Sequence, residues 1–159
     1  MRLNIKDRKY LELAIKTAGE NMEDGGGPFG AIITKGENIL ARAGNRVVPA
    51  HDPTAHAEVI AIRMAAEKLG THDLSDCTIY ASCEPCPMCL GAIYWAGIRR
   101  LVYSSDRYTA ASAGFSDNHI YEELALDNDS RSIEMVRGLK KEGDNVLKRW
   151  VDLPDKIQY

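Results

Sequence analysis

The chain has 159 residues, of which 45% are hydrophobic and 27% charged, and its formal net charge is −3. A chain of this length can bury about two thirds of its unfolded surface, so it can fold as one globular domain without disulfides, and its composition is not that of a disordered protein. The acidic balance argues against a protein that binds nucleic acid through the phosphate backbone, and the paired basic residues have acidic neighbours, which is typical of a solvated face.

The cysteines and the amino terminus indicate a cellular compartment. Three of the four cysteines lie between positions 83 and 89, which favours metal chemistry in a reducing environment over a disulfide framework. The first eight residues lack the apolar core of a signal peptide, and no run of about 18 apolar residues follows. We therefore expect a cytoplasmic protein without a membrane-spanning segment.

The first 45 residues predict a helix and a hairpin. Apolar residues at helical spacing indicate an amphipathic helix that the glycines from Gly25 end; they are Leu11, Ala14, Ile15, Ala18 and Met22. Two short apolar runs, 29–34 and 39–41, are joined by a Lys-Gly-Glu-Asn turn and predict the hairpin. No Gly-Lys-Ser/Thr or GxGxxG pattern accompanies the glycines, so we interpret them as a turn and not as a phosphate site.

The middle of the chain alternates helices and strands. Cap residues at 52–54 precede a helix that runs to about Leu69 and ends at Gly70. A strand, a helix and a second strand follow, at residues 77–81, 87–96 and 100–104. The residues of this second helix that we expect to face the core are Leu90, Ile93 and Tyr94.

The last third predicts a crossover, a strand and a terminal helix. Residues 106–131 form short helical pieces, long enough for a crossover that would make a strand at 133–137 parallel to its neighbour. A helix from about Asp144 to Trp150 ends before Pro154. The sequence therefore predicts one α/β domain over residues 1–159, a three-layer α/β/α fold with a central mixed five-stranded sheet.

One cluster of residues indicates a catalytic zinc site. Cys86 and Cys89 are spaced so that both sulfurs can reach one metal ion from the first turn of a helix, although a lone CxxC also occurs as packed thiols or as a redox disulfide. His56 adds a third donor, and Glu58 adds a carboxylate that the metal does not need as a ligand. The combination of HxE with PCxxC some 30 residues later is the signature of zinc deaminases. Three protein ligands leave a position for water, which indicates catalysis.

The same residues predict a mechanism. Because two thiolates offset the charge of Zn²⁺, the bound water needs a base, and Glu58 would take its proton and return it to a ring nitrogen and then to the departing amine. His56 and Glu58 can face one water only if His56 lies at the irregular start of the helix. Cys83 could be a fourth ligand or a packed thiol near the site, and Cys77 is expected in the core.

Several motifs together resemble the cytidine and deoxycytidylate deaminase superfamily, namely residues 27–31, Asn45, 51–58 and 83–89. Within it, residues 90–96, 113–117, 120–121 and the terminal tyrosine look like bacterial guanine deaminases, and the similarity runs from about position 10 to position 159. The HDPTAHAE and EPCxMC portions are shared with tRNA adenosine deaminases. They identify the chemistry and not the substrate.

The resemblance implies a cytidine deaminase-like fold and the hydrolysis of guanine to xanthine and ammonia, with zinc-bound hydroxide attacking C2 and Glu58 shuttling protons. The residues that would contact the purine are Phe29, Asn45, Trp95, Asp117 and Tyr159. Asp117 would also be a second catalytic carboxylate, with Glu122 or Glu123 as alternatives. By residue type alone, Asn45 could equally be turn material, the two aromatic residues could fill the core, and Asp117 could cap a helix.

The resemblance also implies one zinc ion per subunit and a homodimer in which residues 153–159 exchange between subunits, so that Tyr159 closes the partner's site. Other substrates stay open, among them guanosine or another amino-heterocycle and adenosine in tRNA. A zinc-stabilised module without enzymatic activity is a further alternative.

Overall fold

The computed structural model describes residues 3–158. The chain divides into two compact units, Met1–Asn118 and His119–Tyr159, which we describe separately. Tyr159 itself lies outside the described residues. Within the described part of the chain, no helix has the length and apolar character needed to cross a membrane.

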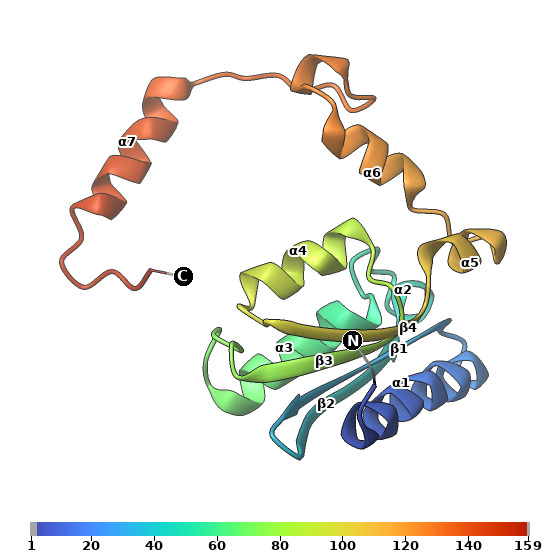
Figure 1. The fold of residues 1–159 in the computed structure, drawn as a ribbon. Coiled ribbons are helices and arrows are strands. Elements are labelled where there is room, and N and C mark those ends of the chain that lie inside the picture. Colours follow the sequence, from blue (N-terminus) through green and yellow to red (C-terminus); the bar gives the residue numbers. More distant parts are fainter. Residues whose placement is uncertain (1–2, 159) are drawn as a thin grey trace. The chain divides into compact units, whose positions relative to one another are not determined.

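The first unit is built on a mixed sheet of four strands in the order β2-β1-β3-β4 (Figure 1). The strands are β1 (Gly27–Lys35), β2 (Asn38–Asn45), β3 (Cys77–Cys83) and β4 (Arg100–Ser105). β1 is antiparallel to both of its neighbours, whereas β3 and β4 are parallel. The parallel pair needs a crossover connection, and a helix between the two strands provides it.

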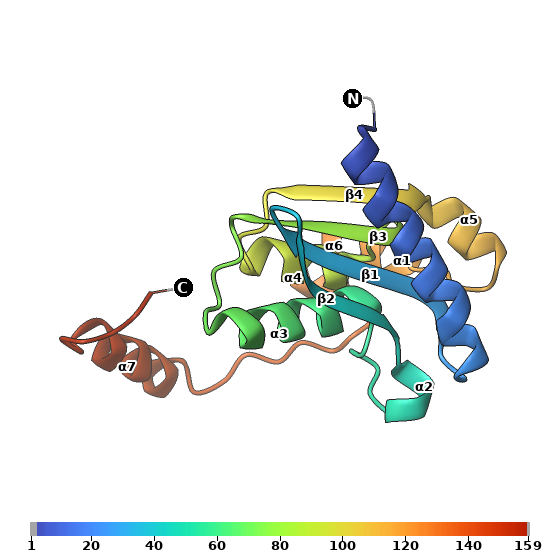
Figure 2. The same cartoon turned by 90° about the horizontal axis from the view of Figure 1, so that it is seen from below.

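Helices cover both faces of this sheet. α1 (Ile5–Glu23) packs on one face, and α3 (Ala57–Leu69) and α4 (Pro87–Trp95) lie on the other (Figures 1 and 2). The predicted three-layer α/β/α arrangement and the mixed sheet are thus confirmed. The remaining helices of this unit are the short α2 (Val47–Ala50) and α5 (Arg107–Ser112).

Successive residues of β1 contribute to two separate cores. Ile32 packs with Tyr10 of α1 and with Tyr80 of β3, whereas Ala31 and Ile33 join the core beneath α3 and α4. This alternation follows from the two-residue period of a strand. β1 is therefore a central strand whose two faces pack against different helical layers.

Alanines let α3 lie close to the sheet. Ala57, Ala61 and Ala65 are four residues apart, on one face of the helix, and each is fully buried. The helix ends where Gly70 adopts the left-handed conformation, with a φ of 65°. The end predicted at Leu69 is therefore confirmed.

The start of α3 differs from the prediction. Asp52 Oδ1 accepts hydrogen bonds from the backbone nitrogen and hydroxyl of Thr54, at 2.8 and 2.7 Å, and so closes a turn instead of capping the helix. The cap residue of α3 is His56. Of the residues expected to face inward from α4, Ile93 is buried, but Tyr94 is 74% exposed, so the prediction for Tyr94 was wrong.

The second unit contains α6 (Asn118–Ala125), whose first residue belongs to the first unit, a 3₁₀ turn (Asn128–Ser130) and α7 (Lys140–Val151). Arg131 Nε donates to the carbonyl oxygens of Glu123 and Leu126, at 3.1 and 3.2 Å, which ties the 3₁₀ turn back to α6. The terminal helix was predicted from Asp144, but it begins four residues earlier, after Leu139 in the left-handed conformation.

The predicted fifth strand is absent from the described residues. Residues 133–137 form no strand, and Ile133, Met135 and Val136 are 73%, 47% and 83% exposed. A strand exists only by hydrogen bonding to a neighbour, and β4 has no partner on its outer side among residues 3–158. The five-stranded prediction was therefore wrong, and the sheet formed by the described residues has four strands.

Two glycines of the first unit, Gly30 and Gly19, lead to opposite stability predictions. A Cβ on Gly30 would lie 2.4 Å from the carbonyl oxygen of Ala14 in α1, so Gly30→Ala should lower the free energy of unfolding by about 1–3 kcal/mol. A Cβ on Gly19 would meet nothing within 4 Å, and Gly19→Ala should raise it by about 0.5–1 kcal/mol. Urea denaturation measures both values. Equal effects of the two substitutions would contradict the close contact of β1 with α1.

Candidate metal and catalytic site

Two helix starts meet beyond the carboxyl-terminal end of β3. His56 is the cap residue of α3, and Cys86 is the cap residue of α4, with Pro87 at the first helical position. Cys89 lies in the first turn of α4 and is fully buried. The backbone of His56 is extended, with φ −71° and ψ 151°, which confirms that it precedes the regular helix. This extended residue is why His56 and Glu58 can face the same point.

The donor atoms of these residues have the spacing of a zinc site. His56 Nδ1 lies 3.6 Å from Cys86 Sγ and 3.5 Å from Cys89 Sγ, and all three donors are within 4.8 Å of one another. Zinc bonds of about 2.3 Å to sulfur and 2.0 Å to nitrogen, at the tetrahedral angle, place nitrogen and sulfur roughly 3.5 Å apart. The three residues therefore fit one tetrahedral zinc ion with a fourth position left over.

Hydrogen bonds within the site favour the thiolate form of Cys86. A hydrogen bond with Cys89, together with one from His56, lowers the pKa of the Cys86 thiol to about 4. The thiol of Cys86 is therefore a thiolate at neutral pH, the form that binds zinc. The hydrogen bond with Cys86 raises the pKa of His56. The start of α4 adds positive potential from its unpaired amide groups, which favours the thiolate further.

Glu58 lies beside the donors without joining them. Its Oε2 is 3.5 Å from Cys89 Sγ, the side chain is 7% exposed, and burial raises the pKa of its carboxyl group. A carboxylate in this position can hold a proton next to the open coordination position. The structure thus brings together the four residues that the sequence singled out, with the carboxylate in the place of a general base.

Two of the predicted purine contacts lie where β1 and β2 meet. Asn45 is the last residue of β2 and is 8% exposed, and its Oδ1 accepts a hydrogen bond from the backbone nitrogen of Val47 at 3.2 Å. Phe29 is half-buried in β1, and its ring meets that of Phe115 edge to face, with 5.0 Å between the ring centroids. The contact with Phe115 was not anticipated from the sequence.

The other predicted contacts are more scattered. Asp117 is half-buried and lies two residues beyond Phe115, in the loop after α5. Trp95 is 75% exposed at the end of α4, roughly 9 Å along the helix axis from Cys89. Tyr159 lies outside the described residues. The roles of these three residues stay predictions.

The remaining thiols are packed, and a neighbouring glutamate holds the ligand loop. Cys83 Sγ is 3.6 Å from the carbonyl oxygen of Asp106 and does not belong to the donor cluster, while Cys77 is 3% exposed in the core. Glu84 Oε2 accepts a hydrogen bond from the backbone nitrogen of Arg107 at 3.1 Å. Glu84 therefore joins the loop before Cys86 to the start of α5, a role that its position in the motif did not indicate.

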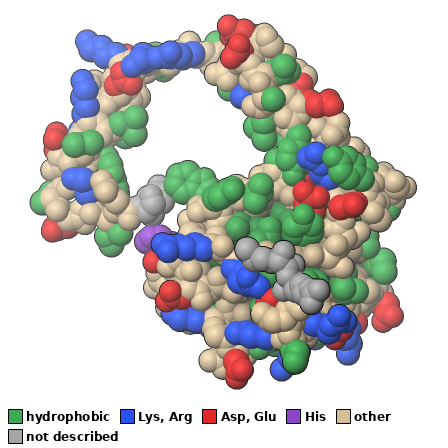
Figure 3. Space-filling model, in the orientation of Figure 1, with side chains coloured by type: hydrophobic (Ala, Val, Ile, Leu, Met, Phe, Trp, Pro, Cys, Tyr) green, Lys and Arg blue, Asp and Glu red, His purple; other side chains and the backbone are tan. Residues whose placement is uncertain are grey.

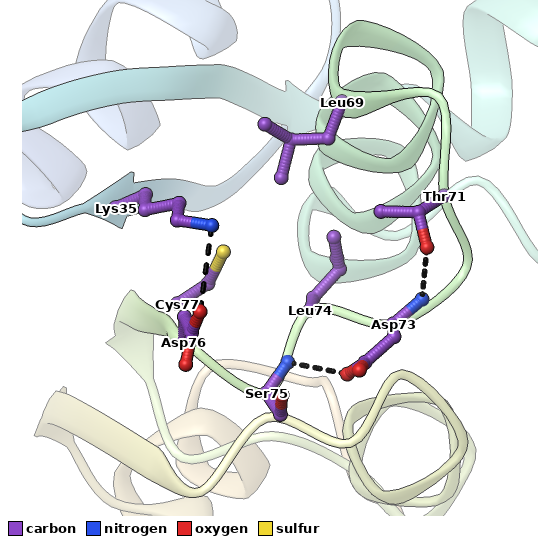
Figure 4. Close-up of a pocket in the computed structure, with 8 residues that line it drawn as sticks. All are labelled: Lys35, Leu69, Thr71, Asp73, Leu74, Ser75, Asp76 and Cys77. Atoms are coloured by element: carbon purple, nitrogen blue, oxygen red, sulfur yellow. Dashed lines mark hydrogen bonds and ion pairs between the residues drawn. The ribbon is translucent and has the colours of Figure 1, made fainter.

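A pocket of about 260 Å³ lies at the opposite end of β3 (Figure 4). Cys77 lines it at the start of the strand, roughly 20 Å along β3 from Cys83 and the ligand loop. Lys35 Nζ and Asp76 Oδ2 are 3.4 Å apart in its wall, and Asp73 Oδ1 accepts from the backbone nitrogen of Ser75 at 2.9 Å. Because the pocket lies at the other end of β3, it is separate from the metal donors.

Residues 4–105 match the family model described as "Cytidine and deoxycytidylate deaminase zinc-binding region". The chain belongs to this family. Zinc is therefore its metal, and His56, Cys86 and Cys89 are the candidate ligands.

Individual members of the deaminase family differ in how much of the chain they match. The chain is 44% identical over 151 residues to guanine deaminase from Bacillus subtilis (strain 168), which covers 94% of this chain and 97% of the relative. A crystal structure of guanine deaminase from Bacillus subtilis has a TM-score of 0.93 at 42% identity and covers 99% of both chains. The tRNA-specific adenosine deaminase of Agrobacterium fabrum is 43% identical over 99 residues, or 60% of this chain and 63% of the relative.

Removal of single thiols should separate ligands from packed cysteines. The Cys86→Ser variant should lose most of its zinc after dialysis, because a hydroxyl replaces one of three donors. Cys83→Ser should keep the wild-type zinc content of one ion per chain, although it loses a packed sulfur. Atomic absorption measures the zinc content of both variants. Zinc loss on removal of Cys83 would make it a fourth ligand and would close the catalytic position.

Proposed function

We propose that the protein is a guanine deaminase that hydrolyses guanine to xanthine and ammonia. The observation that carries the proposal is the buried carboxylate of Glu58 beside three converging metal donors, 3.5 Å from the nearest sulfur. The substrate is supported by similarity to guanine deaminase over 94% of this chain, compared with 60% for the tRNA-specific enzyme. The chain's acidic net charge of −3 also favours a small substrate over a polyanion.

The reaction replaces the exocyclic amine at C2 with oxygen. A carbon–oxygen bond forms from water, the carbon–nitrogen bond to the amine breaks, and two protons must move from the water to the purine. When bound, zinc lowers the pKa of water and so supplies a nucleophile at neutral pH. Glu58 accepts the first proton and delivers it to a ring nitrogen, and it then takes the second proton from the added hydroxyl and delivers it to the amine, which leaves as ammonia. Its raised pKa, caused by burial, brings the carboxyl group closer to the range that such a shuttle requires.

The purine would lie between the two predicted contacts on β1 and β2. Because Asn45 Oδ1 accepts from Val47, the Nδ2 group of this amide is the side that can donate to an acceptor on the base. Phe29 offers a ring for stacking, and Phe115 fixes the angle of that ring. Asp117, close in sequence to Phe115, would accept from the exocyclic amine. Glu123 is a poorer substitute, because its Oε2 already accepts from the backbone and hydroxyl of Ser132.

Ammonia release measures the substrate directly. The zinc-loaded protein should turn over guanine faster than guanosine, adenine, cytosine or adenosine in tRNA. Glu58→Gln should keep zinc and fold while the rate falls about 10²–10⁴-fold, because the amide cannot accept the proton. Absence of guanine turnover by the wild type would refute the proposed substrate. Full activity of Glu58→Gln would refute the proton shuttle.

We also propose a homodimer in which residues 153–159 pass to the partner subunit. Each unit exposes apolar side chains that a single chain leaves in water. Tyr94 and Trp95 of α4 are 74% and 75% exposed in the first unit, and Figure 3 shows hydrophobic side chains gathered over the region of α4. In α7 the exposed apolar residues are Val146, Leu147, Trp150 and Val151. Apolar surfaces of this kind are typical of protein interfaces.

A cytoplasmic location and a single deaminase domain over residues 1–159 stay predictions from the sequence.

A chain that ends at Asp152 tests the exchanged tail. If the tail closes the partner's site, its removal should raise KM for guanine and weaken the dimer, while the zinc content stays at one ion per chain. Light scattering gives the mass, and steady-state kinetics give KM. A truncated protein with unchanged mass and unchanged activity would argue against the exchange.

A further inference from the structure

A buried amide at the end of α1 joins three segments of the chain. Asn21 is 8% exposed, and its Nδ2 donates to the carbonyl oxygens of Gly27 and Asn45, at 2.7 and 2.8 Å. The backbone carbonyl oxygen of Asn21 accepts a hydrogen bond from the backbone nitrogen of Gly26 at 2.9 Å. Both hydrogens of the side-chain amide are therefore used on backbone carbonyls, one at the start of β1 and one at the end of β2.

Two glycines make the space that this amide occupies. A Cβ on Gly26 would lie 2.2 Å from Asn21 Nδ2, and a Cβ on Gly44 would lie 2.2 Å from Asn21 Oδ1. Neither glycine has a positive φ, so the backbone conformation does not require glycine at these positions. The absent side chains are explained by the close approach of the Asn21 amide. Gly26 and Gly44 thus leave a space that the side-chain amide of Asn21 fills.

The amide lies where the pairing of β1 with β2 becomes irregular. Gly27 pairs with Asn45, but the register shifts between Gly27 and Gly30, so Pro28 and Phe29 fall within the irregular stretch. Carbonyl groups next to such a stretch need a partner other than the ordinary ladder. Asn21 provides this partner to both strands at once. It therefore fixes the separation of the two strand ends that carry Phe29 and Asn45.

The side chain of Asn45 depends on the same separation. A Cβ added to Gly27 would lie 3.1 Å from Asn45 Oδ1, so this side chain packs directly over the Gly27 backbone that Asn21 holds. A small shift of the Gly27 backbone would consequently move the amide group of Asn45. The side chain of Asn21 bonds the backbone carbonyl groups of Gly27 and Asn45. Its effect on the side chains of Asn45 and Phe29 would therefore pass through the backbone.

We propose that Asn21 is a positioning residue for purine recognition, which sets the geometry of Asn45 and Phe29 through the backbone of β1 and β2. The inference rests on the proposed function, in which these two residues contact the base. Loss of the Asn21 hydrogen bonds should weaken purine binding about tenfold while the catalytic rate of bound substrate changes little, because the metal donors and Glu58 belong to other elements.

The test compares Asn21→Asp with a matched substitution on the same helix. Aspartate keeps the shape of the side chain but cannot donate to the two carbonyls. The control is Thr17→Val, one turn earlier and 7% exposed, where the hydroxyl donates to Leu13 within α1 and accepts from Arg42 Nε. Asn21→Ala provides a second variant in case the carboxylate prevents folding. The measurements are zinc content, thermal unfolding, KM and kcat for guanine, and Kd for xanthine by calorimetry.

Asn21→Asp and Asn21→Ala should raise KM and the xanthine Kd about tenfold, with kcat within about threefold of wild type and full zinc content. Thr17→Val should lower the unfolding temperature without changing KM or Kd. If the wild type neither turns over guanine nor binds xanthine, the proposed function is wrong, and the role proposed for Asn21 is then wrong as well. If the wild type does both, and folded Asn21 variants match it in KM and Kd, only the positioning role is overturned. An equal rise in KM for Thr17→Val would overturn it as well.

Discussion

Three donor atoms at the starts of two helices lie within 4.8 Å of one another, and the structure of the first unit is organised around this convergence. His56 precedes α3, whereas Cys86 and Cys89 lie in the first turn of α4. The sheet holds both helices on one face, with their starts at the carboxyl-terminal end of β3 (Figure 1). Small residues of α3 reduce its distance from the sheet, so the alanine face that begins at Ala57 contributes to the position of His56.

The pKa values of Glu58 and Cys86 are shifted in opposite directions, and each shift suits the role proposed for the residue. Burial raises the pKa of Glu58, which suits a group that takes up and releases a proton. The thiol of Cys86 is also partly buried, but hydrogen bonds from Cys89 and His56 outweigh the loss of hydration and keep it a thiolate. Two acids only a few ångströms apart thus have pKa values shifted in opposite directions. Such separation is typical of sites that combine a metal ligand with a base.

The predicted purine contacts depend on a different part of the fold. Asn45 and Phe29 extend from strand ends whose spacing is set by Asn21 on the opposite face of the sheet from α3 and α4. Asn21 acts on the backbone of these strand ends from α1, whereas the candidate zinc donors lie at the starts of α3 and α4.

The sequence by itself predicted the candidate zinc ligands, the proposed base Glu58 and most helices and strands, because ligand chemistry and hydrophobic periodicity are visible in local patterns of residues. It also placed His56 before the regular helix, from the need for two residues to face one water. Only the tertiary structure decided that residues 133–137 lack a strand partner, that Tyr94 is exposed, and that Asn21 is a buried link between strands. Each of these depends on a neighbour distant in sequence, and a local pattern carries no information about whether that neighbour is present.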